Sequence, residues 1–308
     1  MIVRVLGSAA GGGVPQWNCA CANCTAARAG NAPHRSSSSF AVSATGDRFW
    51  LVNVSPDIAQ QIESYVPLQP RAGRGTPIAG MLLTDANVDH LGGLAVLRQA
   101  GEHTFTVYST STVRALATAQ EAFAAFAAPP HRWNAIEPSS SFALDDALDV
   151  TVVPIVGLTP GYAGRVPRRD AVVAYAITDR ASGETVLFAP VFMEVTQSLV
   201  DAAREADAAF FDGSFWSDDE LAGVGVAKAA RSLGHAPVGG PDGSLAVLRG
   251  LPPGARRFYA HLNNTSPLLD EGSDAARELR AAAFGIAYDG LELRFGASLR
   301  SPDPSVPL

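Results

Sequence analysis

The chain has 308 residues, of which 47% are hydrophobic, and it carries a formal net charge of −7. This length can bury one large core or two smaller ones, while the negative charge argues against general nucleic-acid binding, which needs basic surface to neutralise phosphates. No apolar run in the sequence approaches the roughly 20 residues that span a bilayer, and the first residues lack the apolar stretch of a signal peptide. We therefore expect a cytoplasmic protein without membrane insertion, whose thiols stay reduced.

The first half of the chain alternates between strand and helix patterns. An opening strand is predicted at 1–7, and two strands at 39–44 and 49–55 flank a glycine-containing turn that is typical of a hairpin. The next predicted elements are a helix at 56–65, a compact apolar strand at 78–84, a helix at 91–100, a strand at 104–109 and a helix at 111–126.

The second half repeats this alternation with more strands. Strands are predicted at 148–157, 171–178, 185–191, 208–213, 255–262 and 291–295, and helices at 193–205, 243–251 and 274–283. No repeat or linker divides the chain, so we expect one domain over 1–308 with a proline-rich tail at 301–308. Hairpins mixed with strand–helix units favour an α/β fold with antiparallel parts, built of two packed sheets with helices outside.

Polar side chains follow three of the predicted strands at the point where each strand ends. Asp89 and His90 lie in "TDANVDH", Asp212 lies in "FFDGS" and His261 lies in "YAHLNN". Loops at one edge of layered sheets collect functional groups, and two histidines with one carboxylate form the facial triad that holds non-haem iron(II). The alternative is structural: Asp89 begins a helix as its cap, and His261 is a hydrogen-bonded core residue.

The three cysteines of the chain lie together in the segment 14–30. Cys19, Cys21 and Cys24 form a C-x-C-x-x-C pattern that supplies three thiolates from one loop. A structural zinc site needs four ligands in a tetrahedron, so a fourth ligand must come from elsewhere in the chain. The alternative is a reactive or redox-sensing group in which one disulfide forms and one thiol remains free.

Longer motifs resemble a known family. "TDANVDHLGGL" resembles the metallo-β-lactamase superfamily motif THxHxDHxxGL, and the chain from "LGSAAGGGVPQWNCACANC" to "YAHLNNTSPLLDEGS" resembles the pyrroloquinoline quinone (PQQ) biosynthesis protein B family. The resemblance implies a four-layer αββα sandwich, the metallo-β-lactamase fold, with two facing mixed sheets and outer helices.

The departures from the superfamily pattern bear on activity. Asp85 and Asn87 stand where a two-zinc hydrolase has its first two histidines, no histidine follows "VTVVPI", and Ala189 and Pro190 stand where the bridging aspartate is expected. The remaining candidates are Asp89, His90 and His261, which form one mononuclear site. The resemblance implies an iron-dependent hydroxylase that uses O2 to hydroxylate the tyrosine-derived ring of a cross-linked Glu-Tyr precursor of PQQ.

Further roles follow from the resemblance. Residues that replace or flank ligand positions are expected to hydrogen-bond substrate or ligated water; they are Asp85, Asn87, Asn263 and Asn264. Asp212 is expected either to orient a metal-bound histidine or to serve as a turn carboxylate. A phosphodiesterase of the carbon–phosphorus lyase pathway has a similar cysteine-rich opening and a distant histidine as fourth zinc ligand, which by position implies His235 here.

Two functions of other classes stay open at this point. One is a non-catalytic carrier that assists transport of PQQ or its precursor to the periplasm, and the other is a degenerate metal-dependent hydrolase. Association with other proteins of the PQQ pathway and formation of a homodimer are also left open by the sequence.

Overall fold

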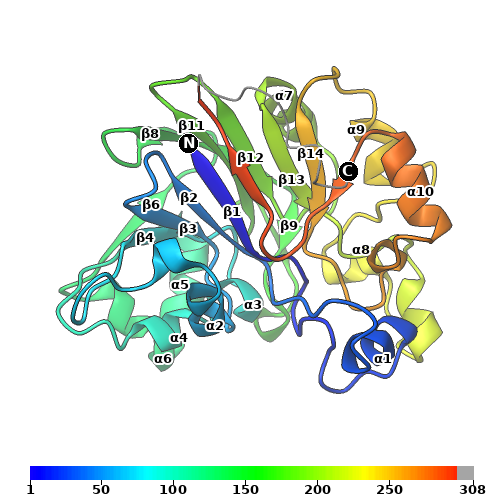
Figure 1. Ribbon diagram of the computed structural model, residues 1–308, viewed down its shortest axis with the longest axis horizontal. Helices are drawn as coiled ribbons and strands as arrows, with labels where there is room; N and C mark the ends of the chain where they lie inside the picture. Colours follow the sequence, from blue (N-terminus) through cyan, green and yellow to red (C-terminus); the bar gives the residue numbers. More distant parts are fainter. Residues whose placement is uncertain (297–308) are drawn as a thin grey trace.

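Two mixed sheets of seven strands lie face to face in the computed structural model, which describes residues 1–296 (Figure 1). The first sheet has the order β16-β1-β2-β3-β4-β5-β6. Its strands are β1 (Ile2–Gly7), β2 (Ser39–Ser43), β3 (Phe49–Val52), β4 (Ile78–Leu82), β5 (Thr106–Thr110), β6 (Arg132–Ile136) and β16 (Glu292–Arg294). The sheet is antiparallel from β16 to β3 and parallel from β3 to β6.

The second sheet has the order β15-β14-β13-β12-β11-β8-β7. Its strands are β7 (Ser141–Ala143), β8 (Leu148–Pro154), β11 (Val173–Asp179), β12 (Thr185–Ala189), β13 (Ala208–Asp212), β14 (Arg256–Ala260) and β15 (Gly285–Ile286). Strands β7 to β12 are antiparallel and β12 to β15 are parallel, so hairpins and crossovers coexist as the sequence predicts. A small separate ribbon pairs β9 (Gly157–Leu158) with β10 (Pro167–Arg168).

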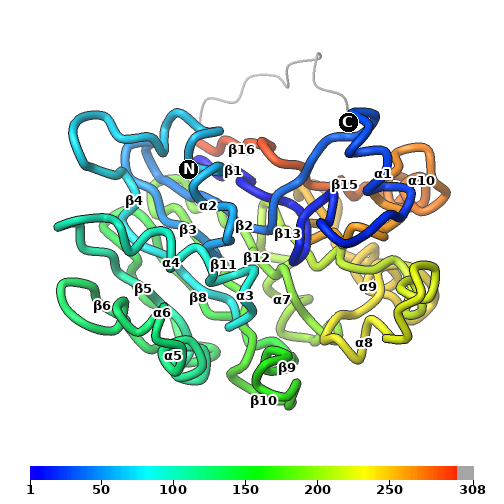
Figure 2. Tube along the Cα trace, turned by 90° about the horizontal axis from the view of Figure 1, so that it is seen from below, coloured from blue at the N-terminus to red at the C-terminus, as the bar shows by residue number. Residues whose placement is uncertain are grey.

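Helices cover the outer face of each sheet. The first half of the chain, between the strands of the first sheet, contains α1 (Ala22–Arg28), α2 (Ile58–Glu63), α3 (Val88–Leu91), α4 (Leu94–Leu97), α5 (Ser111–Thr118) and α6 (Glu121–Ala124). The second half adds α7 (Gln197–Glu205), α8 (Ala230–Leu233), α9 (Ser244–Leu248) and α10 (Asp274–Ala281), and 3-10 turns occur at Val66–Leu68, Ala125–Ala127, Gly161–Ala163, Glu220–Val224 and Pro267–Leu269. Figures 1 and 2 show α2 to α6 and α8 to α10 on opposite sides of the molecule.

The alternation of side chains along each strand explains the layers. In β2, Phe40 and Val42 face the second sheet, whereas Ala41 between them packs against the outer helices. In β3, Trp50 and Val52 likewise face inward. These two strands therefore bury both of their faces, because successive side chains of a strand point to opposite sides. These layers confirm the predicted αββα sandwich.

The predicted helix at 91–100 is interrupted in the structure. Helix α3 begins at Val88, and α4 begins only after the pair Gly92 and Gly93. The amide of Gly93 donates to the carbonyl of Val54 at 2.9 Å, and a Cβ at Gly93 would lie 2.2 Å from the carbonyl oxygen of Ser55. The helix is broken because the chain must approach the end of β3 closely at this point.

Two further comparisons with the sequence concern the ends of the chain. Helix α1 forms inside the cysteine segment, where no helix is predicted. The predicted proline-rich tail at 301–308 lies outside the residues that the structure describes. Within residues 1–296, none of the helices is both long and apolar enough to cross a membrane.

Candidate metal centre and its pocket

A pocket of about 200 Å³ opens where strands of both sheets end. The segment after β4 brings Asn87 and Asp89 to it, the segment after β14 brings His261, and the loop after β1 brings Gly11. Strands β13 and β14 are parallel neighbours, with Asp212 paired to Ala260, so their carboxyl ends meet at one edge. This topology places the predicted polar strand ends together.

Asp89, His90 and His261 form a compact cluster at the floor of this pocket. One ligand atom from each lies within 4.8 Å of the others. Asp89 Oδ2 lies 3.2 Å from His261 Nε2 and 3.7 Å from His90 Nε2. The Nε2 atom of His90 is buried and has no hydrogen-bond partner among the described residues. A buried polar atom without a partner is costly, so this nitrogen indicates a site for a missing ligand.

Asp85 holds His90 from behind and does not face the pocket. Its Oδ2 lies 2.6 Å from His90 Nδ1 and accepts a 2.8 Å hydrogen bond from Thr84 Oγ1. Its Oδ1 accepts from the backbone and side-chain amides of Asn87, at 2.9 and 2.8 Å. The carboxylate therefore keeps the proton of His90 on Nδ1 and leaves Nε2 free to bind a metal ion.

Ser214 connects His261 to Asp212. The hydroxyl of Ser214 donates to Asp212 Oδ1 at 2.6 Å and lies 2.7 Å from His261 Nδ1, whereas the carboxylate itself is 3.8 Å from that nitrogen. His261 Nδ1 thus donates to Ser214, and its Nε2 faces Asp89. The sequence analysis missed Ser214, although the spacing in "DGS" allows a carboxylate to bind the amide two residues on, here at 3.0 Å.

His235 belongs to this hydrogen-bond network. Its Nδ1 lies 2.7 Å from Asp212 Oδ2 and 3.1 Å from Ser214 Oγ, and its ring stacks on that of His261 with the centroids 5.5 Å apart. Asp212, His235 and His261 also offer ligand atoms within 4.8 Å of one another. Because hydrogen bonds already join these atoms, we interpret Asp212 and His235 as residues that hold the ring of His261 in position.

Neighbouring opposite charges shift the pKa values of the ionisable groups in this centre. Burial would raise the pKa of Asp89, but the charges of His90 and His261 hold it well below its usual range. Burial would lower the pKa of His261, yet the neighbouring carboxylates of Asp212 and Asp89 raise it to about 10. The pKa of His90 is raised as well, against its burial, chiefly by Asp85 and Asp89. A metal ion would take the place of these protons.

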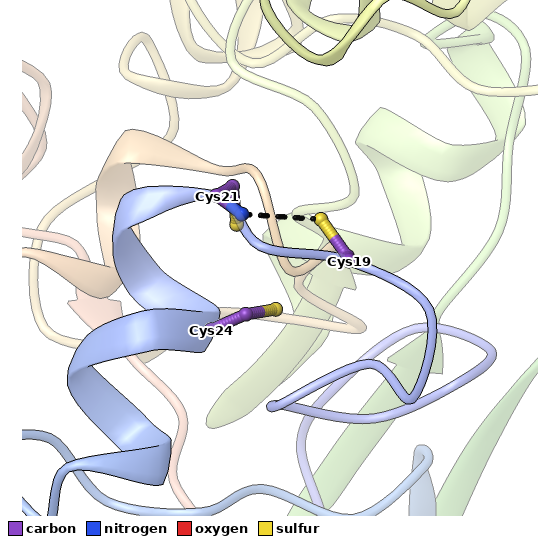
Figure 3. A group of neighbouring side chains, drawn as sticks. All are labelled: Cys19, Cys21 and Cys24. Atoms are coloured by element: carbon purple, nitrogen blue, oxygen red, sulfur yellow. Dashed lines mark hydrogen bonds between the residues drawn. The ribbon is translucent and has the colours of Figure 1, made fainter.

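The three cysteines form a second cluster, separate from the first. Figure 3 shows their sulfur atoms turned toward one another, with Cys24 on α1, Cys21 at the start of this helix and Cys19 in the loop before it. The three Sγ atoms lie within 4.8 Å of one another. Hydrogen bonds from Cys24, Cys19 and Asn264 outweigh burial and lower the pKa of the Cys21 thiol, whereas burial raises that of Cys24.

The prediction that His235 joins the three cysteines as a fourth ligand is wrong. His235 is turned to Asp212 and does not join the cysteine cluster. Asn264 occupies that place, with Nδ2 at 3.5 Å from Cys21 Sγ and 3.4 Å from Cys24 Sγ. The error arises because position in the chain relative to another protein does not decide which loop packs against α1. Here the segment after β14 packs against α1, and Asn264 in that segment is only three residues beyond His261.

Two further loops complete the pocket. A Cβ at Gly11 would lie 3.1 Å from the carboxyl carbon of Asp89, so a larger residue in this N-terminal loop would crowd that carboxylate. The loop between β9 and β10 brings Arg165 to the pocket wall, and Figure 2 shows this hairpin at the rim of the molecule. Asn263 also lines the pocket, as does Phe215.

Comparison with known proteins gives consistent matches over nearly the whole chain. The profile of the beta-lactamase superfamily domain matches residues 48–261. Coenzyme PQQ synthesis protein B of Ruegeria pomeroyi is 37% identical over 95% of this chain and 99% of its own length. The corresponding protein of Rhizobium meliloti is 38% identical over 95% of this chain and 97% of its own length.

Solved structures agree with these matches. The crystal structure of Zn²⁺-bound PqqB from Methylobacterium extorquens superimposes with a TM-score of 0.90 at 36% identity, covering 96% of this chain and all of that one. A diphosphatase from the PhnP family superimposes with a TM-score of 0.69 at 18% identity, covering 96% of each chain. The second likeness concerns the fold alone.

Proposed function

Since this chain belongs to the coenzyme PQQ synthesis protein B family, on a metallo-β-lactamase fold, we propose that it is an iron(II)-dependent hydroxylase of PQQ biosynthesis. Asp89, His90 and His261 would hold the metal ion, and the substrate would be the tyrosine-derived ring of a cross-linked Glu-Tyr precursor. The co-substrate would be O2, and the reaction would take place in the cytoplasm. Other proteins of the pathway would deliver the precursor.

The observation that carries this proposal is the orientation of the donor atoms. The unpartnered Nε2 of His90 and the Nε2 of His261 both face Asp89, and each ring is fixed through its other nitrogen, by Asp85 and by Ser214. Two imidazoles and one carboxylate fit iron(II) and leave coordination positions open. When bound there, iron(II) supplies the activation of O2.

The surroundings of the triad favour one metal ion. At the end of β12, where a two-metal hydrolase carries its bridging aspartate, Ala189 and Pro190 are buried and offer no side-chain ligand. Asp85 stands where the hydrolases have a metal-binding histidine, but its carboxylate is engaged in hydrogen bonds with His90 and Thr84. A two-metal hydrolase needs both ions to hold the attacking and leaving oxygens, so the described residues suit a hydrolase poorly.

The protein's own groups would position the ring. Phe215 and Leu158 give the pocket apolar walls, and Asn87 and Asn263 give it amide groups able to hydrogen-bond a phenol or catechol oxygen. These groups would exclude bulk water from the reacting carbon and hold it beside the open metal positions.

We also propose a structural zinc ion at Cys19, Cys21 and Cys24. The clustering of three thiols in one short segment fits zinc, and the homologue from Methylobacterium extorquens was solved in a Zn²⁺-bound form. Asn264, whose amide lies against two of the thiols, would take the fourth place through its side-chain oxygen, because an amide NH2 group cannot bind a metal ion. The ion would then tie α1 to the segment that carries His261 and so support the pocket.

The hydroxylase proposal is tested by anaerobic reconstitution with iron(II), followed by addition of O2 and the tyrosine-type precursor. We expect a product heavier by one or two oxygen atoms, a gain that is lost in Asp89→Ala and kept in Asp145→Ala, whose carboxylate binds Trp50 away from the pocket. No gain, together with normal binding of finished PQQ, would favour the carrier function. Metal-dependent turnover of a phosphodiester or lactam would favour the hydrolase.

A further inference from the structure

We propose that Arg165 binds a carboxylate group of the substrate and thereby selects amino-acid-derived ligands. This inference rests on the proposed function in one respect, since it takes the ligand to be a small acid that carries an aromatic ring. It adds a binding residue on a loop that contributes nothing to the metal centre itself.

The charges around the pocket create a need for such a residue. Asp89 lines the pocket, and the buried carboxylates of Asp85 and Asp212 lie directly behind the two histidines. A precursor built from Glu and Tyr carries ionised carboxylates at neutral pH. The three negative charges of Asp85, Asp89 and Asp212 outnumber the two positive charges of a bound divalent metal ion, so this end of the pocket would still repel them. Arg165 is the pocket-lining residue with a permanent positive charge, so it offers the place where a carboxylate can be accommodated.

The hairpin is built so that the guanidinium of Arg165 lies across its backbone. A Cβ at Gly161 would be 2.8 Å from Arg165 Nη2 and 3.0 Å from its Cζ, so any larger residue there would displace the side chain. Arg165 itself has a φ of 50°, a left-handed conformation that is uncommon for arginine. Gly161 lines the pocket as well, so the guanidinium that lies against it is at the pocket wall.

Hydrogen bonds fix this loop to the metal centre. Tyr162 Oη donates to the carbonyl of Ala86 at 2.7 Å, between the metal-centre residues Asp85 and Asn87. Thr159 Oγ1 accepts from the amide of Val166 at 2.9 Å and donates to the carbonyl of Ala163 at 3.1 Å. A cation held on a fixed loop loses less freedom when it binds a ligand, which favours affinity.

The guanidinium also lacks a competing partner. Among residues 1–296, no carboxylate lies within 4.0 Å of Arg165, whereas Arg168 on the same hairpin pairs with Asp170 at 3.7 Å. Arginine presents paired N–H donors that match both oxygens of a carboxylate. The free guanidinium at the wall of an otherwise acidic pocket therefore has the chemistry of a carboxylate receptor.

The test compares two probes that differ only in charge, 3-(3,4-dihydroxyphenyl)propanoate and its primary amide. Binding to the zinc-loaded full-length protein is measured by calorimetry without O2, so that no turnover is needed. We expect wild-type protein to prefer the acid about tenfold, equivalent to about 1.4 kcal/mol. The preference should vanish in Arg165→Gln and persist in Arg169→Gln, which removes the same charge from the same hairpin away from the pocket wall.

A second variant checks the geometry. Gly161→Ala leaves the charge in place but crowds the guanidinium, so it should reduce the preference while the far-ultraviolet circular dichroism stays unchanged. Equal affinity of wild-type protein for both probes, or an equal loss of both in Arg165→Gln, overturns the inference. Because binding is measured without turnover, absence of hydroxylation would refute the proposed function alone. An unchanged KM for hydroxylation in Arg165→Gln would refute the inference alone.

Discussion

Replacing Asp85 by asparagine should weaken metal binding, although Asp85 itself would not contact the metal ion. Asp85 is fully buried and accepts hydrogen bonds from His90, Thr84 and Asn87. An amide keeps the shape and can still accept from Asn87, but it turns an NH2 group toward His90 Nδ1. The imidazole must then move its proton to Nε2, the nitrogen that faces Asp89. A protonated Nε2 cannot bind a metal ion.

The size of this effect follows from the role of the carboxylate. Loss of the group that orients a metal-bound histidine typically costs about 10 to 100-fold in metal affinity, or roughly 1.4 to 2.7 kcal/mol. The measurement is an anaerobic titration of the metal-free protein with iron(II) against a chromophoric chelator. Asp145→Asn is the control, because Asp145 also accepts hydrogen bonds, from Trp50, Ala147 and Leu148, but lies away from the pocket. A folded Asp85→Asn protein with wild-type iron affinity would refute the reasoning.

The remaining predictions concern the hydrogen-bond network, the thiol cluster and pH. Ser214→Ala breaks the link from His261 to Asp212 and should lower iron(II) affinity by about tenfold in the same titration, with zinc content unchanged. Wild-type protein should hold about one zinc ion at the thiol cluster, and Cys24→Ser should lose this ion and melt at a lower temperature. Normal zinc content in this variant would contradict the assignment. In metal-free protein, the pKa of His261 rises from 6.5 to about 10 on folding, so its contribution to stability is complete below pH 6.5 and declines as the pH rises toward 10. Thermal melts across that interval should show the decline in metal-free protein and a weaker one after iron(II) is added, because the metal ion replaces the proton.

Local sequence patterns were sufficient to predict the layers and the clustering of Asp89, His90 and His261. Strands with two buried faces, such as β2 and β4, can be recognised because they form short, uncharged and largely apolar runs in the sequence. Asp89 and His90 are adjacent in the chain, and His261 follows its strand at once, so their place at one sheet edge depends only on where strands end. The sequence also indicated the thiol cluster, since the three cysteines are held together by one short segment.

The partners of these residues were decided only by the tertiary structure. Asn264 reaches Cys21 across 243 positions of the chain, and His235, expected there, belongs instead to Asp212. Likewise, Arg165 lines the pocket although no local pattern marks it, and Tyr162 joins its hairpin to the loop that carries Asp85 and Asn87. The physical reason is that strand periodicity and strand ends are short-range properties of the chain. The contact between two loops is set by how the sheets and helices beneath them pack.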